Sequence, residues 1–207
     1  MEILFKYFQS LTPIQLEQFG RLHELYSFWN DQINVISRKD IDNLYLNHVL
    51  HSLSIVKLIS FEDDTTILDV GTGGGFPGIP LAILFPSVEF HLIDSIGKKI
   101  KVAQNVVDEL ALTNVRCSQI RAEQIDEKYD FIVSRAVTTL PDFYKWIHAK
   151  VSPKSFNIIH NGILYLKGGN LSDEIDKIST KPVLSYPISA WYDEDYFLEK
   201  YIIHIPI

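Results

Sequence analysis

The sequence predicts an α/β fold: a mostly parallel sheet with helices on both faces and an antiparallel C-terminal hairpin, preceded by a helical N-terminal segment. The first of three observations behind this prediction is that residues 1–60 carry apolar side chains at helical spacing. From Thr65 onward, short apolar runs alternate with helix-like stretches, an order typical of parallel sheets. Two apolar stretches then follow one another closely near the C-terminus. We therefore expect a helical segment at 1–60 and an α/β domain at 61–207.

Helix start signals are clear in the N-terminal segment. Residues 12–15, Thr-Pro-Ile-Gln, offer a hydroxyl N-cap, a proline at the first helical position and a glutamine at the capping-box position. Apolar residues then recur at steps of three and four until about Trp29, which predicts one helix. A second helical stretch is expected at about 41–59, with Asp40 or Asp42 as its N-cap.

The α/β domain is predicted from its short apolar runs and the helix-like stretches between them. We expect strands at about 66–70, 88–94, 114–120, 129–134, 162–166, 183–191 and 197–205. Helices are expected at 78–85, 98–110 and 140–151. The last two strands are close in sequence, which favours an antiparallel pair.

Composition excludes several classes of protein. The 207 residues are 46% hydrophobic and 22% charged, which is ordinary for a globular chain. The longest clean apolar run, 79–85, is far shorter than the roughly 20 residues of a membrane span, and the N-terminus lacks a signal peptide, so we expect a cytoplasmic protein. The one cysteine, Cys117, excludes an internal disulfide and disfavours a metal site. A net charge of −7 counts against a nucleic-acid coat but permits a local basic patch.

The most informative segment is a glycine-rich turn between the first predicted strand of the α/β domain and its helix. Five of the ten glycines lie within residues 71–78. Glycines placed there let the backbone approach a ligand closely, and the next helix offers free N–H groups. The turn therefore predicts a cofactor site, the alternative being an ordinary loop.

The charges around this turn favour one kind of cofactor. The glycine spacing formally fits a dinucleotide fingerprint, with Asp94 at the end of the next strand to accept ribose hydroxyls. Asp69, however, would repel a pyrophosphate, and Pro77 and Pro80 occupy the start of the pyrophosphate helix. The same carboxylate attracts an ammonium and a sulfonium. We therefore favour S-adenosylmethionine, and keep an NAD-dependent oxidoreductase as the alternative.

Several motifs carry a resemblance to a known family. They are Phe-Pro-Gly-Ile-Pro at 76–80, Leu-Ile-Asp-Ser at 92–95, Ser-Arg-Ala at 134–136, Leu-Lys-Gly at 166–168 and the helical blocks at 29–34 and 48–53. Together they resemble the bacterial 16S ribosomal RNA guanine-N7 methyltransferases, also called glucose-inhibited division protein B. The chain departs from the family pattern at three places. Many members carry an acid at the position of His51, a basic residue near the position of Asn47, and proline at the position of Gly74.

The resemblance implies a class I, Rossmann-like S-adenosylmethionine-dependent methyltransferase. It would methylate N7 of a guanine in 16S ribosomal RNA, within the small subunit or its precursor, and act as a monomer. N7 bears a free lone pair, so catalysis reduces to placement and needs no histidine base. RNA's deep major groove shields N7, which favours an unpaired guanine, with Phe76, Tyr144 or Tyr165 as stacking candidates. A non-catalytic ribosome-assembly factor on the same fold is a further alternative.

The cofactor residues are expected at the carboxyl ends of the strands and in the turn. Asp94 would accept two ribose hydroxyls, and Asp69 would orient the amino group or else cap the turn. Phe76 would line the methionine end or else belong to the core. By resemblance the full set is Asp69, Gly71, Gly73, Phe76, Asp94, Ala122, Glu123 and Arg135.

Arg135 is the best catalytic candidate, because it ends a strand at the same edge as Asp69 and Asp94. The family's matching arginine contacts the cofactor, and we hypothesise that Arg135 also holds the target guanine or its phosphate. Residues expected to bind RNA are Lys98, Lys99, Arg121 and Lys167, with solvated surface charge as the alternative.

Overall fold

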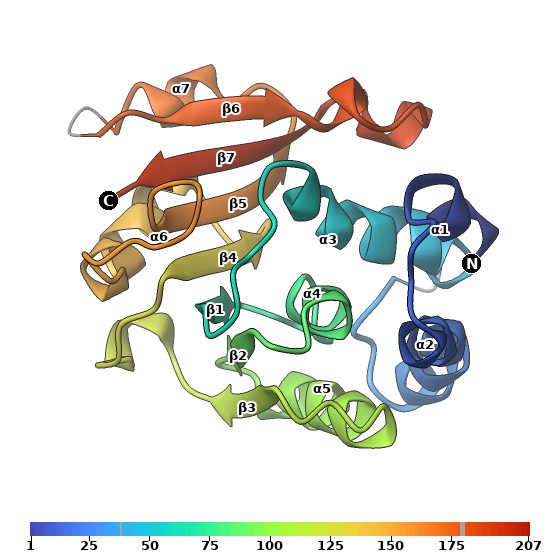
Figure 1. Ribbon diagram of the computed structural model, residues 1–207. Helices are drawn as coiled ribbons and strands as arrows, with labels where there is room; N and C mark the ends of the chain where they lie inside the picture. The colour runs from blue at the N-terminus through green and yellow to red at the C-terminus, as the bar shows by residue number, and fades with distance from the viewer. Residues whose placement is uncertain (38, 179–180) are drawn as a thin grey trace.

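A seven-stranded sheet forms the centre of the protein (Figure 1). The computed structural model describes residues 1–37, 39–178 and 181–207. The strand order is β3-β2-β1-β4-β5-β7-β6, and β7 alone among these strands runs in the opposite direction to the rest. The bounds are β1 Thr66–Val70, β2 Glu89–Asp94, β3 Val115–Gln119, β4 Phe131–Arg135, β5 Gly162–Gly168, β6 Leu184–Pro187 and β7 Lys200–Pro206. The predicted α/β class, the mostly parallel sheet and the antiparallel C-terminal pair are confirmed.

Helices cover both faces of this sheet, because successive side chains along its strands point alternately into two apolar cores, one on each face. Ile67 of β1 joins the core shared with the N-terminal segment, whereas Leu68 joins the core on the opposite face. Helices α4 (Gly78–Leu84) and α5 (Gly97–Glu109) lie on the first face, and α6 (Leu140–Ile147) and α7 (Ser172–Ile175) on the other (Figure 1). Short 3-10 turns complete the domain: η4 Ala122–Gln124, η5 His148–Lys150, η6 Ile188–Ala190 and η7 Asp195–Phe197.

The N-terminal segment opens with α1 (Glu2–Tyr7) and α2 (Pro13–Gln32). The predicted capping box of α2 is present. The Gln15 N–H donates to Thr12 Oγ1 at 3.3 Å, and the Thr12 N–H donates to Gln15 Oε1 at 2.9 Å. Thr12 thus sets the start of α2 through local hydrogen bonds alone.

The second helical stretch is continuous but irregular. It passes through a 3-10 turn, a π-helical segment, an α-helical turn and another 3-10 turn: η1 Ile41–Asn43, η2 Leu44–Leu50, α3 His51–Leu53 and η3 Ser54–Lys57. Of the two expected N-cap residues, Asp40 occupies the N-cap position of η1, although its side chain makes no capping hydrogen bond, and Asp42 lies inside that turn. Instead, Asp40 Oδ1 accepts a hydrogen bond from Asn47 Nδ2 at 3.0 Å, which ties the chain before η1 to η2.

The N-terminal segment packs directly over the glycine-rich turn. The buried Tyr26 hydroxyl of α2 donates to the Gly74 carbonyl at 2.6 Å. Gln15 Nε2 donates to the Ile83 and Leu84 carbonyls at the end of α4, each at 3.1 Å. Helix α2 therefore fixes both the turn and the helix that follows it. In the described part of the chain, no helix combines the length and the apolar character needed to cross a membrane.

Candidate functional site

The glycine-rich turn joins β1 to α4 through backbone conformations that favour glycine. Gly71, Gly73 and Gly75 have φ of +67°, +59° and +107°. A Cβ on Gly71 would overlap the Val137 side chain, and a Cβ on Gly78 would lie 2.7 Å from Leu92 Cδ1. Glycine is therefore required here both for conformation and for space.

Asp69 holds this turn closed from the end of β1. Its fully buried Oδ2 accepts hydrogen bonds from Thr72 Oγ1 at 2.6 Å and from the Gly78 N–H at 2.8 Å. Burial raises the pKa of Asp69 to about 7, although these two hydrogen bonds favour the carboxylate. Among the described residues, Oδ1 has no hydrogen-bond partner. The capping role is thus present in the structure, and an effect of Asp69 on the cofactor's amino group stays a prediction.

A cavity of about 430 Å³, which we call the first cavity, opens at the carboxyl ends of β1, β2 and β4. Residues from strand ends that are far apart in sequence meet there, because parallel strands end at the same edge. Seven predicted residues line it: Gly71, Asp94, Lys99, Arg121, Ala122, Glu123 and Arg135. Val137 and Trp146 are among the other residues that line it, and neither was predicted from the sequence.

Asp94 connects the glycine turn to the start of α5. Its Oδ2 accepts from the Gly73 N–H at 3.1 Å, and its Oδ1 accepts from the Ile96 N–H at 2.8 Å. Each carboxylate oxygen keeps a second lone pair, so a ligand hydroxyl can still be bound. This geometry suits the predicted ribose contact.

Arg135 is held by the N-terminal segment. Its Nη2 donates to His48 Nδ1 at 2.7 Å, and its Nη1 donates to the Asn47 carbonyl at 3.2 Å. The guanidinium carbon lies 5.3 Å from the centroid of the Phe76 ring. Phe76 is only 3% exposed and packs on Tyr26, so it belongs to the core beneath Arg135 and does not line the first cavity.

His48 is a neutral acceptor in this arrangement. Burial, followed by the charge of Arg135, lowers its pKa to about 3. Because Nδ1 accepts from Arg135, the ring proton belongs on Nε2. The same two causes lower the pKa of the neighbouring His51 well below its ordinary value. Neither imidazole is charged near neutral pH.

The predicted RNA-binding residues do not form one patch. Lys98 is exposed on α5, while Lys99 and Arg121 face the first cavity. The side chain of Lys167 is only 10% exposed, and its Nζ pairs with Glu174 Oε2 at 2.5 Å. The alternative of solvated surface charge is therefore wrong for Lys167, which forms a largely buried ion pair.

The aromatic stacking candidates are largely engaged elsewhere. Tyr165 is fully buried and stacks on Phe143 with ring centroids 4.5 Å apart. Its hydroxyl accepts from the N–H groups of Val137 and Thr138, each at 2.9 Å. Tyr165 therefore shapes the loop beside the first cavity and is excluded as a base-stacking residue. Tyr144 stacks on His148 at 4.8 Å.

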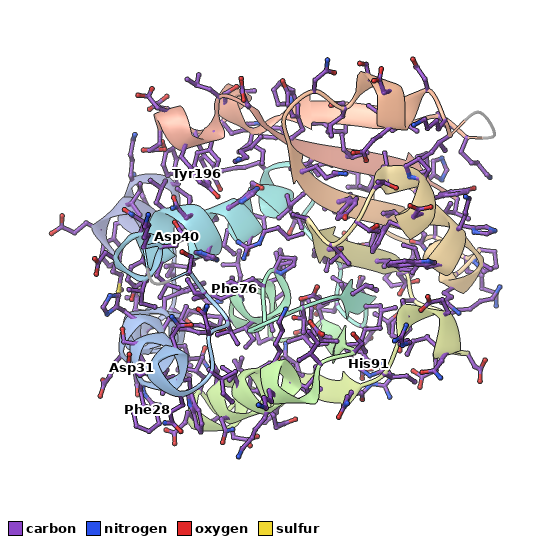
Figure 2. All side chains as sticks on the ribbon, turned by 180° about the vertical axis from the view of Figure 1, so that it is seen from behind. Phe28, Asp31, Asp40, Phe76, His91 and Tyr196 are labelled. Carbon is purple, nitrogen blue, oxygen red and sulfur yellow. The ribbon has the colours of Figure 1, made fainter. Side chains whose placement is uncertain are left out.

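A second cavity, of about 220 Å³, lies beside the first at the ends of β4 and β5 and the start of β7. Arg135 and Ala136 line both cavities, so they form the wall between them. Asp40 and Tyr196, labelled in Figure 2, both line the second cavity although they lie far apart in the sequence. No local motif marks them; only the antiparallel direction of β7, which brings Lys200 to this edge, could have indicated the site.

Comparison with known proteins identifies the family. The family model described as GidB, rRNA small subunit methyltransferase G, matches residues 15–190. The chain is a member of the GidB family. A Ribosomal RNA small subunit methyltransferase G of Cytophaga hutchinsonii is 53% identical over 206 residues, covering 100% of this chain and 99% of that protein. Its namesake in Flavobacterium johnsoniae is 54% identical over 207 residues, covering 100% of this chain and 98% of that protein.

Solved structures agree with the fold of this GidB protein. A SAM dependent methyltransferase from Aquifex aeolicus superposes with a TM-score of 0.56 at 15% identity, covering 75% of this chain and 89% of that one. At this identity the likeness shows the fold alone. The predicted class I methyltransferase fold and the resemblance to the family are both confirmed.

The first cavity fits S-adenosylmethionine. The Asp94 carboxylate stands at the end of β2, where it can accept ribose hydroxyls. Gly71 presents bare backbone to the cavity, in a place that a Cβ could not occupy. Asp69 adds a buried acid behind the turn, which favours a cationic ligand over a pyrophosphate.

Proposed function

We propose that this protein transfers a methyl group from S-adenosylmethionine to N7 of a guanine in 16S ribosomal RNA. The observation that carries the proposal is the position of Arg135, which forms a wall shared by two adjoining cavities at the carboxyl edge of the sheet. A methyl donor and its acceptor need such neighbouring sites. Membership of the GidB family and the names of its relatives support the reaction class, and the guanine N7 specificity follows from the family resemblance.

The residues of the first cavity would hold the cofactor. Asp94 would accept its ribose hydroxyls, and Gly71 would bring backbone close to its methionine end. Gly73 does not line the first cavity, and its N–H donates to Asp94. Ala122 and Glu123 would lie against the adenine, as the resemblance implies. When bound, the cofactor supplies a methyl group on a positively charged sulfur, so that the N7 lone pair forms the new bond while the carbon–sulfur bond electrons remain on sulfur.

The protein's own contribution is placement, because N7 has no proton to lose. Arg135 is fixed by His48, by Asn47 and by the ring of Phe76, so its position is set before a ligand arrives. Holding the reacting atoms in line at about 3–3.5 Å supplies several kcal/mol. His48 has no role as a base in this scheme, since it is neutral and its Nδ1 is already occupied.

The cellular setting is part of the proposal. A cytoplasmic monomer acting on the small ribosomal subunit, or on its precursor, fits the reaction and the family. The acidic chain, with a net charge of −7, would approach RNA through the basic residues at the sheet edge. Lys99 and Arg121 at the first cavity and Arg135 between the cavities supply that charge.

Methylation of small subunits from a strain that lacks this protein tests the proposal. The purified protein should add 7-methylguanosine to 16S RNA, measured by mass spectrometry of the digested RNA. In calorimetry, S-adenosylhomocysteine should bind at micromolar concentrations and NAD should not. NAD binding without methylation would support an oxidoreductase, and S-adenosylhomocysteine binding without methylation would support a non-catalytic assembly factor.

A further inference from the structure

The second cavity combines one carboxylate with several donors. Among the described residues that line it, Asp40 is the only carboxylate, facing a set that includes Arg135 and Lys200. Lys167 also lines it but is already paired with Glu174. An acid at a substrate site for RNA repels phosphate, so its presence needs another chemical reason.

Asp40 is fixed in place on the wall of this cavity. Asn47 Nδ2 donates to its Oδ1 at 3.0 Å, while the Asn47 carbonyl accepts from Arg135 Nη1 at 3.2 Å and from the Tyr196 hydroxyl at 3.1 Å. Asn47 therefore links the carboxylate to the arginine on the wall shared with the first cavity. Within the described chain, Asp40 Oδ1 has this one side-chain partner and Oδ2 has none, so the carboxylate keeps acceptor capacity.

Guanine is the base whose chemistry matches such an acceptor. Its Watson–Crick edge presents two adjacent donors, N1–H and the N2 amino group, and a carboxylate can accept from both. Adenine presents a bare N1 acceptor there and would face the carboxylate unfavourably. Enzymes that act on an unstacked base read it by hydrogen bonds to this same edge. Methylation at N7 also leaves the purine positively charged, which a nearby carboxylate stabilises.

We propose that the second cavity receives the target guanine and that Asp40 recognises its N1–H and N2 amino groups. This inference rests on the proposed function and adds the residue that selects the base. Arg135 then lies beside the base where the two cavities meet, and Asp40 contacts the base at its Watson–Crick edge, which faces away from N7.

The test uses the full-length protein and 16S RNA in which the methylated guanosine is replaced by inosine, which lacks only the N2 amino group. Both RNAs are assembled into small subunits, and initial methylation rates are measured for wild type, Asp40→Asn and Asp42→Asn. Asp42 is a matched control because it is exposed and does not line the cavity. Calorimetry with S-adenosylhomocysteine measures ligand binding in the first cavity independently of the RNA.

Wild type should methylate guanosine on the order of 10-fold faster than inosine, the effect of one charge-assisted hydrogen bond. Asp40→Asn should slow guanosine methylation on the order of 10- to 100-fold and reduce the guanosine preference to about twofold, with S-adenosylhomocysteine affinity unchanged. Asp42→Asn should match wild type throughout.

A slower Asp40→Asn variant that keeps the wild-type preference for guanosine would reveal a purely structural role and overturn the inference. Equal wild-type rates on guanosine and inosine would also overturn it. If wild type methylates neither RNA, the proposed function itself fails, and that outcome is distinct because no preference can then be measured.

Discussion

Arg135 and His48 are joined by a hydrogen bond of 2.7 Å between Nη2 and Nδ1. The bond connects the end of β4 to the π-helical segment η2, so the N-terminal segment positions the residue that separates the two cavities. It also fixes His48 as a neutral acceptor. Helical residues that lie outside the glycine turn in the sequence therefore have a direct structural role at the site.

Replacing Arg135 should remove activity without unfolding the protein. We expect Arg135→Ala to lower the methylation rate at least 100-fold, because both the shared wall and its charge are lost. The free energy of unfolding should fall by about 1–2 kcal/mol, since His48 Nδ1 and the Asn47 carbonyl lose their donor. Methylation rates and thermal unfolding of the variant check this prediction. Arg21→Ala, on the surface of α2, is the control. Unchanged turnover in Arg135→Ala would remove the assigned role.

The depressed pKa of His48 predicts a pH dependence of stability. The folded value is about 3, below the ordinary 6.5, so the unfolded chain binds a proton first as pH falls. The stabilisation is complete above pH 6.5 and is lost progressively toward pH 3. His48→Asn keeps an acceptor for Arg135 but does not titrate. Its unfolding free energy should therefore fall less steeply than that of wild type below pH 6.5, by up to about 1.4 kcal/mol per pH unit.

Urea denaturation at pH 7, 6, 5 and 4 measures this difference. Other buried histidines, such as His91, also have lowered pKa values and contribute to both proteins alike. The exposed His23 provides the control variant, His23→Asn, which should follow wild type. Parallel curves for wild type and His48→Asn would contradict the prediction.

Local sequence signals predicted the sheet and the glycine turn well. The strand at 66–70 and the α2 capping box depend on apolar patterning and neighbouring hydrogen bonds, which the sequence contains. The predicted helix at 140–151 ended early, with α-helix to Ile147 and a 3-10 turn beyond, because helix ends depend on tertiary contacts.

Features that depend on distant partners could not be predicted in this way. Lys167 could not be recognised as paired, because Glu174 reaches it only once α7 has docked. Asp40 occupies a predicted N-cap position, but nothing local reveals that its side chain bonds Asn47 and caps no N–H group. The second cavity brings together residues from η2, β4, β5 and β7, so no single motif contains it.

Asp94 should be needed for cofactor binding. In Asp94→Asn the amide NH2 group would face one of the two backbone N–H donors, from Gly73 or Ile96, and one hydrogen bond would be lost. We expect the affinity for S-adenosylhomocysteine to fall about 10- to 100-fold, as measured by calorimetry. Asp63→Asn, at an exposed position before β1, should bind as wild type does. Full affinity in Asp94→Asn would exclude Asp94 as a binding residue.

Two glycines with positive φ allow the effect of backbone strain to be separated from the effect of the shape of the first cavity. Gly71 and Gly169 both have positive φ, but a Cβ on Gly71 overlaps Val137, whereas a Cβ on Gly169 meets nothing within 4 Å. Alanine at Gly169 should lower the free energy of unfolding by about 1–2 kcal/mol, the cost of a left-handed conformation, and alanine at Gly71 should lower it further because the added Cβ overlaps Val137. Only Gly71→Ala should also weaken S-adenosylhomocysteine binding, because Val137 lines the first cavity and must move.

The double variant Gly71→Ala with Val137→Ala completes this comparison. Removing the Val137 methyl groups eliminates the overlap but leaves the backbone strain. Calorimetry should therefore show most of the S-adenosylhomocysteine affinity restored, while chemical denaturation still shows reduced stability. If Gly71→Ala binds as tightly as Gly169→Ala, the turn does not shape the cofactor cavity. If the double variant stays weak, the added methyl group itself meets the ligand, which places the ligand directly against Gly71.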